Sequence, residues 1–271
     1  MEQHPKVIVD NTIGTPTGVN WIGLGTFIRR EIRRTFRVFT QTVVTPWISA
    51  LLYIFIFGSV IGKRIDLIAG VSYIDFVLPG ILMMNIIAGA FTASSSVLYF
   101  ARFTHSVEEM LVAPFSHLEM IVAYTVSGIT RAVIVGIGVY VIALFFSAAT
   151  VAHFGLFLFY SVAVATIFSF LGLLVGLWAK NFEQLNILNT FVILPFSFLG
   201  GMFYSVTMLP EKLQFIVHLN PFFYFIDGIR YSMIGIREAN TAVGVVLIIV
   251  LIVLLGWLTH HLFKIGWRLR A

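Results

Sequence analysis

The sequence predicts an all-α protein that crosses a membrane several times, and three observations lead to this fold class. First, 59% of the 271 residues are hydrophobic and only 11% are charged, whereas a soluble domain has about 25% charged residues. Second, the apolar residues form long runs, which is typical of membrane spans and not of a soluble core. Third, six runs are long enough for a bilayer that needs about 20 apolar residues per helix.

The six predicted spans follow one another with short connections. They cover residues 38–61, 76–100, 118–148, 154–179, 185–206 and 242–263. The third and fourth spans are so close that residues 149–153 must form a tight hairpin. The remaining segments are too short for a soluble domain, so we expect one transmembrane domain over residues 1–271, with a polar tail at residues 1–20.

The distribution of Lys and Arg predicts the orientation. An even number of spans places both termini on one side, and Lys and Arg are in excess on the cytoplasmic side of membrane proteins. The side with the termini has eleven such residues: Lys6, Arg29, Arg30, Arg33, Arg34, Arg37, Arg102, Lys180, Lys264, Arg268 and Arg270. The other side has five: Lys63, Arg64, Lys212, Arg230 and Arg237. We therefore expect both termini in the cytoplasm.

Residues 21–37 form the most strongly amphipathic segment. Apolar side chains recur at helical spacing from Trp21 to Phe36, and five arginines occupy the positions between them. This composition predicts a helix that lies in the cytoplasmic membrane interface. The alternative is a simple topology determinant that precedes the first span.

Residues 191–221 interrupt the pattern of long spans. A membrane-length apolar helix is broken by Pro195 and by Gly200–Gly201, and residues 208–236 are too polar to cross and too apolar to be free in water. Peptide groups freed at membrane depth must be satisfied by protein or by a water-filled cavity. We therefore predict a translocation pathway, although aromatic residues here also suit ordinary packing. Its predicted residues are Phe191, Pro195, Phe198, Gly200, Gly201, Tyr204 and, in the third span, Arg131.

Arg131 is the exception to an otherwise uncharged membrane interior. Burial of an arginine at the bilayer centre costs at least about 2.5–3.5 kcal/mol. Two interpretations stay open, a role in the pathway or in a conformational change, and an anchor whose side chain reaches the cytoplasmic headgroups. Glu119, near the start of the same span, is a candidate partner.

The cytoplasmic loop at residues 104–114 predicts a short helix that is capped by Thr104 or Ser106 and ends at Pro114. Glu108 and Glu109 lie in its first turn, where carboxylates are favourable. Its apolar side chains, Val107, Met110 and Leu111, would pack into a groove, whereas the alternative is a solvated loop helix. A metal site at His105, Glu108 and Glu109 is not predicted, because a second histidine is missing.

No other motif predicts catalysis. Residues 58–64 resemble a phosphate-binding loop, but the spacing is one residue short and Arg64 replaces the Ser or Thr that would hold magnesium. The chain therefore cannot hydrolyse ATP by itself. The absence of cysteine excludes disulfides and thiol chemistry. We attribute the high pI of about 9.6 to cytoplasmic loops and not to nucleic-acid binding.

The order of these motifs resembles that of ABC-2-type transporter permeases, the membrane subunits of a class of ATP-driven exporters, and in particular their YadH-like bacterial subgroup. The resemblance covers nearly the whole chain. It rests on the basic amphipathic helix, Pro79–Gly80, the Glu-Glu loop with Ala113–Pro114, and the fifth span followed by Leu209–Pro210 and Asn220–Pro221.

The resemblance implies a homodimer in the bacterial inner membrane with two copies of a separate ABC ATPase subunit, which would bind the ATP and magnesium. Residues 208–236 would be re-entrant extracellular helices, and residues 104–114 would be the helix that couples to the ATPase. The implied coupling residues are His105, Glu108, Glu109, Met110 and Leu111, together with Arg29, Arg30 and Arg33. The substrate would be amphipathic, either lipid-like, glycan or drug-like. An ATP-independent secondary transporter or channel is the alternative, and a membrane enzyme lacks a catalytic constellation.

Overall fold

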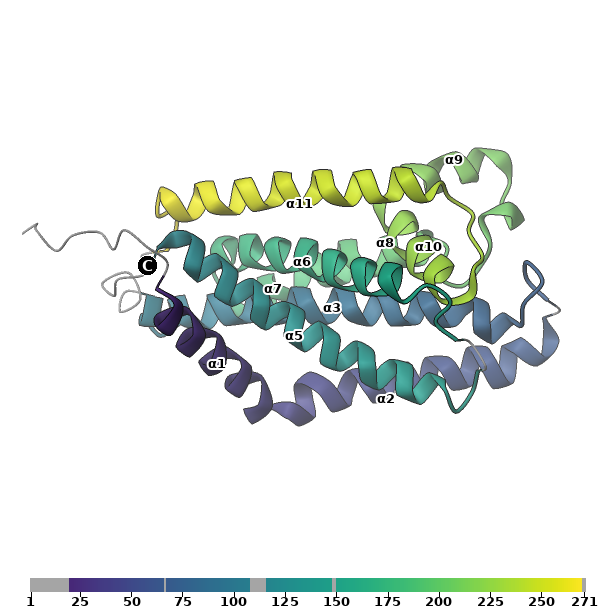
Figure 1. Cartoon of the computed structure of the whole chain (residues 1–271), viewed down its shortest axis with the longest axis horizontal. Coiled ribbons are helices and arrows are strands. Elements are labelled where there is room, and N and C mark those ends of the chain that lie inside the picture. Colours follow the sequence, from purple (N-terminus) through teal and green to yellow (C-terminus); the bar gives the residue numbers. More distant parts are fainter. Residues whose placement is uncertain (1–19, 66, 108–115, 148–149, 270–271) are drawn as a thin grey trace, which may run out of the picture.

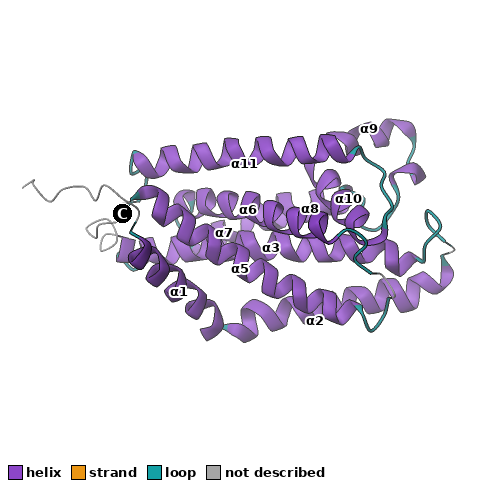
Figure 2. Ribbon diagram, in the orientation of Figure 1, coloured by secondary structure: helices purple, strands orange, loops and turns teal. Residues whose placement is uncertain are grey.

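The computed structural model describes residues 20–65, 67–107, 116–147 and 150–269, and they are overwhelmingly helical (Figure 2). Among them there is no strand, only an isolated bridge between Ile68 and Val71. Six helices are long and apolar enough to cross a membrane, which confirms the predicted fold class. They are Thr40–Gly58, Tyr73–Phe103, His117–Ala143, Phe154–Trp178, Phe182–Leu199 and Thr241–Lys264, called spans one to six below.

Spans one and five are composite helices, and the short helices α9 and α10 lie between spans five and six. The α-helices are α1 (Trp21–Arg37), α2 (Thr45–Ile54), α3 (Tyr73–Phe103), α5 (His117–Ala143), α6 (Phe154–Trp178), α7 (Phe182–Leu188), α8 (Leu194–Leu199), α9 (Glu211–Leu219), α10 (Pro221–Ile234) and α11 (Thr241–Lys264). The π-helical segments are η1 (Thr40–Val44), η2 (Phe55–Ile61) and η4 (Asn189–Ile193), and the 3-10 turns are η3 (Gly62–Arg64) and η5 (Val206–Met208).

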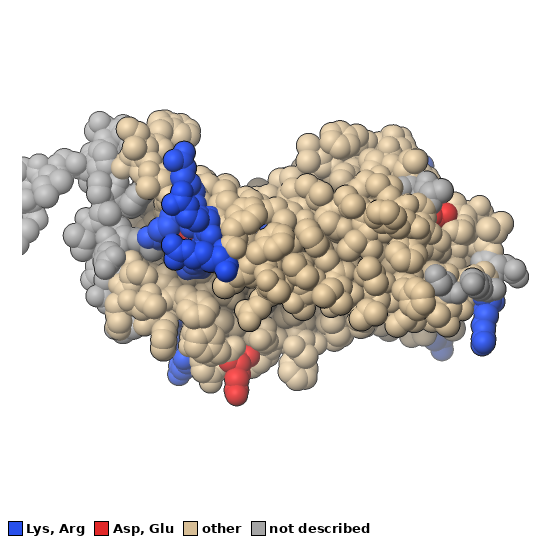
Figure 3. Space-filling model, turned by 90° about the horizontal axis from the view of Figure 1, so that it is seen from below, with Lys and Arg blue, Asp and Glu red and all other residues tan. Residues whose placement is uncertain are grey.

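The long helices lie roughly along one axis, with α3 as the most buried span (Figure 1). Helices α5 and α6 pack on α3, α11 packs on α6, and α2 contacts α3 and α5. At one end α1 runs obliquely to the margin of the bundle, where span one begins, whereas α9 and α10 lie at the other end (Figure 1). A broad uncharged surface separates the charged groups near the two ends (Figure 3), as expected for a protein with a membrane belt.

Glycines let α3 and α6 approach closely. A Cβ added to Gly172 would lie 2.6 Å from the carbonyl oxygen of Phe91, and one added to Gly176 would lie 2.9 Å from that of Ser95. Small residues at helix contacts are how membrane helices gain van der Waals packing without a hydrophobic driving force. The α3–α6 pair is therefore the rigid centre of the bundle.

A π-helical segment precedes each of two prolines within the spans, so the helix continues through the proline. Segment η1 ends two residues before Pro46, and segment η4 ends two residues before Pro195. Proline cannot donate to the carbonyl four residues back and clashes with it, and a π turn changes that pairing locally. Span five thus runs through Pro195 without a break, which corrects the prediction that this proline interrupts it.

The ends of two spans also differ from the sequence prediction. Span five ends at Leu199 and not near residue 206, because the chain turns at Gly200–Gly201. Span three ends at Ala143, and residues 148–149 of the following hairpin lie outside the described residues. The hairpin is fixed to the end of α10 by backbone bonds from Ala152 to Met233 (3.1 Å) and from His153 to Ser232 (2.8 Å).

The contact between Trp47 of α2 and Gly138 of α5 gives a first prediction. The indole Nε1 donates to the Val135 carbonyl (3.2 Å), and a Cβ on Gly138 would lie 2.0 Å from the indole ring. Gly138→Ala should therefore displace Trp47 and lower the free energy of unfolding by about 1–3 kcal/mol, as overpacking does. Thermal unfolding in detergent measures this, and Gly155→Ala, whose Cβ meets nothing within 4 Å, should change little.

Candidate functional site

Spans one and five differ from the other spans in two ways. They contain all three π-helical segments of the described residues, and such segments are rare and frequently lie at functional sites. They also expose uncharged polar side chains: Gln41, Thr45 and Ser49 at four-residue spacing in span one, and Asn186 and Thr190 in span five. In the described parts of the other four spans, exposed polar side chains are confined to the last turn of α11.

Helix α3 lies between these two polar spans. It contacts α2 of span one and also α7 and η4 of span five. Its half-exposed residues, Met84, Ala88, Thr92 and Ser96, recur every four residues and so share one face of the helix. Helices α5, α6 and α10 pack against other parts of α3. Spans one and five and this stripe of α3 together form one surface, which we call the transport face because Phe191 and Pro195, two of the predicted pathway residues, lie on span five.

An aromatic cluster joins spans one and five at the end where α9 and α10 lie. The ring of Phe203, just after span five, stacks on Phe57 of span one with centroids 4.1 Å apart. Tyr53 and Phe198 lie 6.3 and 5.4 Å from the same ring. Phe198, which the sequence placed on the pathway, therefore belongs to a contact between the two spans, and this cluster limits the transport face at that end.

The break after span five is a tight backbone turn packed against α10. Gly201 has φ +76°, the left-handed region that favours glycine. A Cβ on Gly200 would lie 3.1 Å from the backbone of Phe222 and Phe223. The side-chain amide of Asn220, which also caps α10, donates to the Phe196 carbonyl (2.7 Å). Both glycines are thus required by packing and turn geometry.

Arg230 of α10 satisfies the peptide group that this break leaves free. Its Nη2 donates to the Gly201 carbonyl (2.6 Å) and its Nε to the Phe76 carbonyl of α3 (3.3 Å). The guanidinium also lies 3.9 Å from the centroid of the Phe76 ring, a cation–π contact. Arg230 is completely buried, so it joins span five, α3 and α10 inside the protein.

Two carboxylates, the buried Asp227 and the largely buried Glu238, balance the charge of Arg230. Its Nη1 lies 3.9 Å from Asp227 Oδ1 and 3.7 Å from Glu238 Oε2. The backbone amides of Glu238 and Ala239 donate to Asp227 (2.8 and 3.0 Å). Glu238 in turn accepts from the Ser205 hydroxyl and, at 3.3 Å, from the Val206 amide. The carboxylates are therefore paired and hydrogen-bonded, as buried charges must be.

Asp227 and Arg230 are three residues apart, the spacing of an ordinary helical ion pair, and the sequence analysis missed both their burial and Glu238. A signal was available, because both charges lie in a helix of otherwise mostly apolar residues that Asn220–Pro221 begins. The pair also follows a predicted helix break, where freed carbonyls need donors. Glu238 could not be found in this way, since it reaches the site from the loop beyond α10.

The other predicted pathway residues lie at different places. Phe191, in η4, has 72% of its surface exposed, and Pro195 is half-buried at the start of α8. The Tyr204 hydroxyl donates to the Leu199 carbonyl (2.9 Å) and so closes the turn after span five. Only the first two therefore present surface on the body of span five itself.

Arg131 lies on the face of α5 that packs against α1 and span one, near the bend that joins these two elements at residues 38–39. It is seven residues from Tyr124, whose ring contacts Phe27 of α1, and seven from Gly138, which contacts Trp47. Seven residues are about two helical turns, so the three positions share one face. The side chain is half-buried and its Nε has no hydrogen-bond partner among the described residues.

Glu119 is not the partner of Arg131, which corrects the sequence interpretation. Its Oε1 accepts from the Asn20 amide and its Oε2 from the Ser116 amide, both at 2.7 Å. Twelve residues also separate Glu119 from Arg131 on α5, about 18 Å along the helix. The carboxylate instead fixes the start of α1 to the start of α5.

Most of the predicted coupling loop lies outside the described residues, including Glu108, Glu109, Met110 and Leu111. His105 is described and has φ +55°, an unusual conformation for a non-glycine residue. Val107 is completely buried among residues of α1, α3, α5 and α6. It therefore belongs to the protein's own core and is not available for a partner's groove, contrary to the sequence prediction.

Comparison with known proteins decides the family. The model of the ABC-2 type transporter family matches residues 23–234, most of the chain. The chain belongs to the ABC-2 type transporter family. The permease is 38% identical over 251 residues to the inner membrane transport permease YadH of Escherichia coli K12. This alignment covers 93% of this chain and 98% of that protein. It is also 27% identical to Nodulation protein J of Rhizobium meliloti over 80% of this chain and 82% of that protein.

Family membership confirms the resemblance found in the sequence, including the YadH-like subgroup. The permease is a multi-pass membrane protein with six candidate spans, and its family indicates a transport subunit and not an enzyme. The matched region includes most of α1, the transport face and the Asp227–Arg230 pair, but not Glu238 or any of span six. Most of the elements described above therefore belong to the part of the permease that matches the family.

The Arg230 network gives the second prediction. Arg230→Gln would leave Asp227 and Glu238 buried without their counter-charge, so the free energy of unfolding should fall by about 3–5 kcal/mol. Arg230→Lys keeps the charge but loses the planar fork, so its free energy of unfolding should lie between those of the native chain and Arg230→Gln. Thermal unfolding in detergent measures both, with Arg237→Gln, an exposed neighbour, as the control. Equal melting temperatures for Arg230→Gln and the control would contradict a stabilising role.

Proposed function

We propose that this permease is the membrane subunit of an ATP-driven exporter in the bacterial inner membrane, with both termini in the cytoplasm. It works as a homodimer with two copies of a separate ATPase, and the translocation pathway lies between the two protomers. The observation that carries this proposal is the transport face, where uncharged polar side chains and π-helical turns of spans one and five are exposed. Family membership supports the ATPase partner, since permeases of this family generally work with one.

A second copy explains why polar side chains are exposed at membrane depth. Polar residues within spans face the protein interior or a water-filled cavity and not lipid. The transport face cannot satisfy this rule in one chain, because Gln41, Ser49 and Thr190 are exposed there. When two copies are placed face to face, these side chains line an internal path.

The chemistry of the transport face favours an amphipathic substrate. Uncharged hydroxyl and amide groups lie along spans one and five, and the aromatic cluster of Tyr53, Phe57, Phe198 and Phe203 follows at one end. Hydroxyl and amide groups bind polar headgroups or sugars, and aromatic faces bind apolar parts. Phe191 and Pro195 lie on the same span, and we assign them to the pathway lining. The break at Gly200–Gly201 and Tyr204 shapes its outer end.

Coupling to the ATPase is assigned to the end of the bundle where α3 ends. His105 follows α3, and Glu108, Glu109, Met110 and Leu111 come next in the sequence. We assign these residues to the contact with the ATPase, where motion driven by ATP enters the permease. The nucleotide and magnesium bind to the partner, because the permease has no complete phosphate-binding loop.

Co-expression of the permease with an ATPase tests this function. The complex is reconstituted into liposomes, and ATP hydrolysis is measured with and without lipid extracts of the host. We expect a complex with two copies of each chain, and hydrolysis that an amphipathic lipid fraction stimulates. Reversal of Glu108 and Glu109 to Lys should weaken co-purification of the ATPase, whereas Glu183→Lys, an exposed carboxylate at the start of α7, should not. Transport by the permease alone would support the secondary transporter instead.

The lack of cysteine permits a direct test of the pathway. Single variants Ser49→Cys and Thr190→Cys should react with a membrane-impermeant maleimide, because a thiol forms the reactive thiolate only where water reaches it. Val253→Cys and Val246→Cys, on the exposed apolar face of α11, should stay unlabelled. Mass spectrometry of the labelled chain measures the difference. Equal labelling of all four variants would mean that the transport face does not line a water-accessible path.

A further inference from the structure

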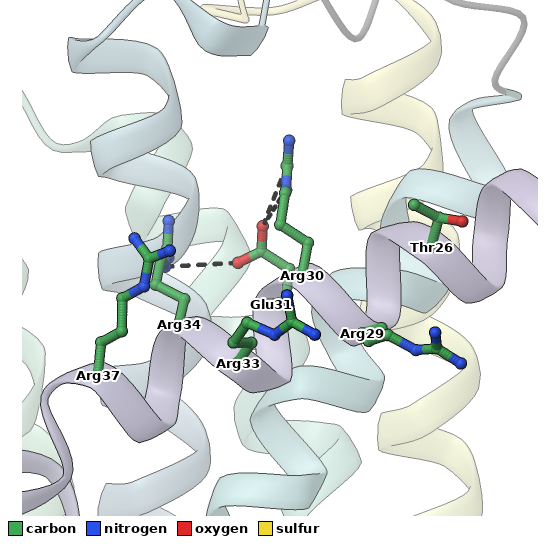
Figure 4. A pocket seen from close by; sticks show the side chains of 7 residues that line it. All are labelled: Thr26, Arg29, Arg30, Glu31, Arg33, Arg34 and Arg37. Atoms are coloured by element: carbon green, nitrogen blue, oxygen red, sulfur yellow. Dashed lines mark hydrogen bonds and ion pairs between the residues drawn. The ribbon is translucent and has the colours of Figure 1, made fainter.

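The exposed side of α1 has a hollow whose chemistry the transport function does not explain. It has a volume of about 500 Å³ and is lined by Thr26, Glu31 and the five arginines of the helix (Figure 4). Five guanidinium groups face only one carboxylate there. In the view from below, these arginines form the largest cluster of positive charge (Figure 3). An excess of positive charge around a hollow predicts an anionic ligand.

Glu31 divides the five arginines into two groups. Only 2% of its side chain is exposed, and it lies on the face of α1 that also buries Leu24 and Phe27. Arg30 and Arg34 approach its two oxygens at 3.1 and 3.5 Å, as the dashed lines in Figure 4 show. This carboxylate therefore fixes two guanidinium groups at the rim of the hollow.

The other three arginines are available for a ligand. Arg29, Arg33 and Arg37 recur every four residues, so they project from one side of α1. All three are exposed and have no ion pair or hydrogen bond among the described residues. A guanidinium is a planar fork of N–H donors that matches the oxygens of a phosphate group in a bidentate manner.

The depth of α1 in the bundle favours a membrane lipid as the ligand. The helix starts at the end of the bundle, where Asn20 is bonded to Glu119, and runs obliquely away from that end to the margin where span one begins (Figure 1). The arginines lie in its second half and are thus set back from that end, at the depth of headgroups if the spans cross the bilayer. An ATPase docked on the end would meet the loop after α3 before it reached them.

Exposed apolar side chains beside the arginines point to the same ligand. Phe36 and Val38, on either side of Arg37 in the sequence, have 50% and 48% of their surface exposed. Exposed apolar residues beside arginines are typical of the boundary between headgroups and acyl chains. An acidic protein surface would leave these two side chains in water.

We propose that the hollow binds the phosphate headgroup of an anionic phospholipid from the cytoplasmic leaflet. Arg29, Arg33 and Arg37 donate to the phosphate, and Glu31 holds Arg30 and Arg34 at the rim. The acyl chains extend into the bilayer beside the bend between α1 and span one. The bound lipid thereby connects α1, which packs on α5 through Phe27 and Tyr124, to the membrane next to the transport face.

Native mass spectrometry of the full chain tests this site, with titration of the detergent-purified protein by phosphatidylglycerol and, in parallel, by phosphatidylcholine. We expect phosphatidylglycerol to bind and the triple variant Arg29→Gln, Arg33→Gln, Arg37→Gln to bind it about a hundredfold more weakly, since each basic residue near an anionic lipid contributes about fivefold. Phosphatidylcholine binding should not change. The matched control, Arg64→Gln, Lys212→Gln, Arg237→Gln, removes three exposed charges at the opposite end and should bind like the native chain.

A second variant covers the case in which the glutamine variant does not insert into the membrane. Replacement of the same three arginines with lysine preserves the charge and the topology signal but removes the bidentate fork. It should bind phosphatidylglycerol more weakly than the native chain. Native affinity in both variants would overturn the proposal. It would also fail if the glutamine variant kept its lipid but lost co-purification of the ATPase, which would assign the hollow to that partner.

Discussion

Inside a bilayer, a peptide group freed by a helix break needs a partner from the protein or from a water-filled cavity, and here the Gly201 carbonyl has Arg230 as its partner. Its guanidinium bonds to the Gly201 carbonyl after span five and to the Phe76 carbonyl of α3. Asp227 and Glu238 compensate its charge and bring in the loop beyond α10. The Gly201 carbonyl is therefore satisfied within the protein, and this end of the bundle is one connected unit.

The end of the bundle where α3 and α6 finish uses arginine in a similar way. Arg102 donates through Nη1 to the carbonyls of Gly176 (2.7 Å) and Leu177 (2.9 Å) at the end of α6. Arg268 donates to the Trp178 carbonyl (2.8 Å). Cations at a helix C-terminus satisfy the unpaired carbonyls and the helix dipole. The residues that predicted the orientation therefore also hold α3, α6 and the C-terminal segment together.

The length of apolar runs and the periodicity of side chains predict only those helices that the local sequence determines. The six spans and the helix at residues 21–37 could be predicted because apolar runs and helical spacing need no knowledge of distant partners. The effect of Pro195 could not, since a π turn before it preserves the helix. The use of Glu119 could not either, because Asn20 is 99 residues away in the sequence.

The candidate site shows the same division. The Asp227–Arg230 pair has the same spacing whether it is buried or exposed, so only packing against Phe76 reveals its role. The polar residues of the transport face lie within apolar runs and have no motif of their own. They become visible only when the exposure of Gln41, Ser49 and Thr190 is compared with the apolar surface of α11.

The π turns of spans one and five have a geometric consequence. A π turn contains about one residue more than an α turn, and each residue of an α-helix corresponds to about 100° of rotation. In span one, η1 lies between α1 and α2 and therefore changes the angular register from one helix to the next. Trp47 fixes the register of α2 against α5. In span five, η4 separates α7 from α8 in the same way. Span five therefore consists of two α-helical segments that differ in angular register, and the same offset separates α2 from α1, whereas α3 and α6 are continuous α-helices.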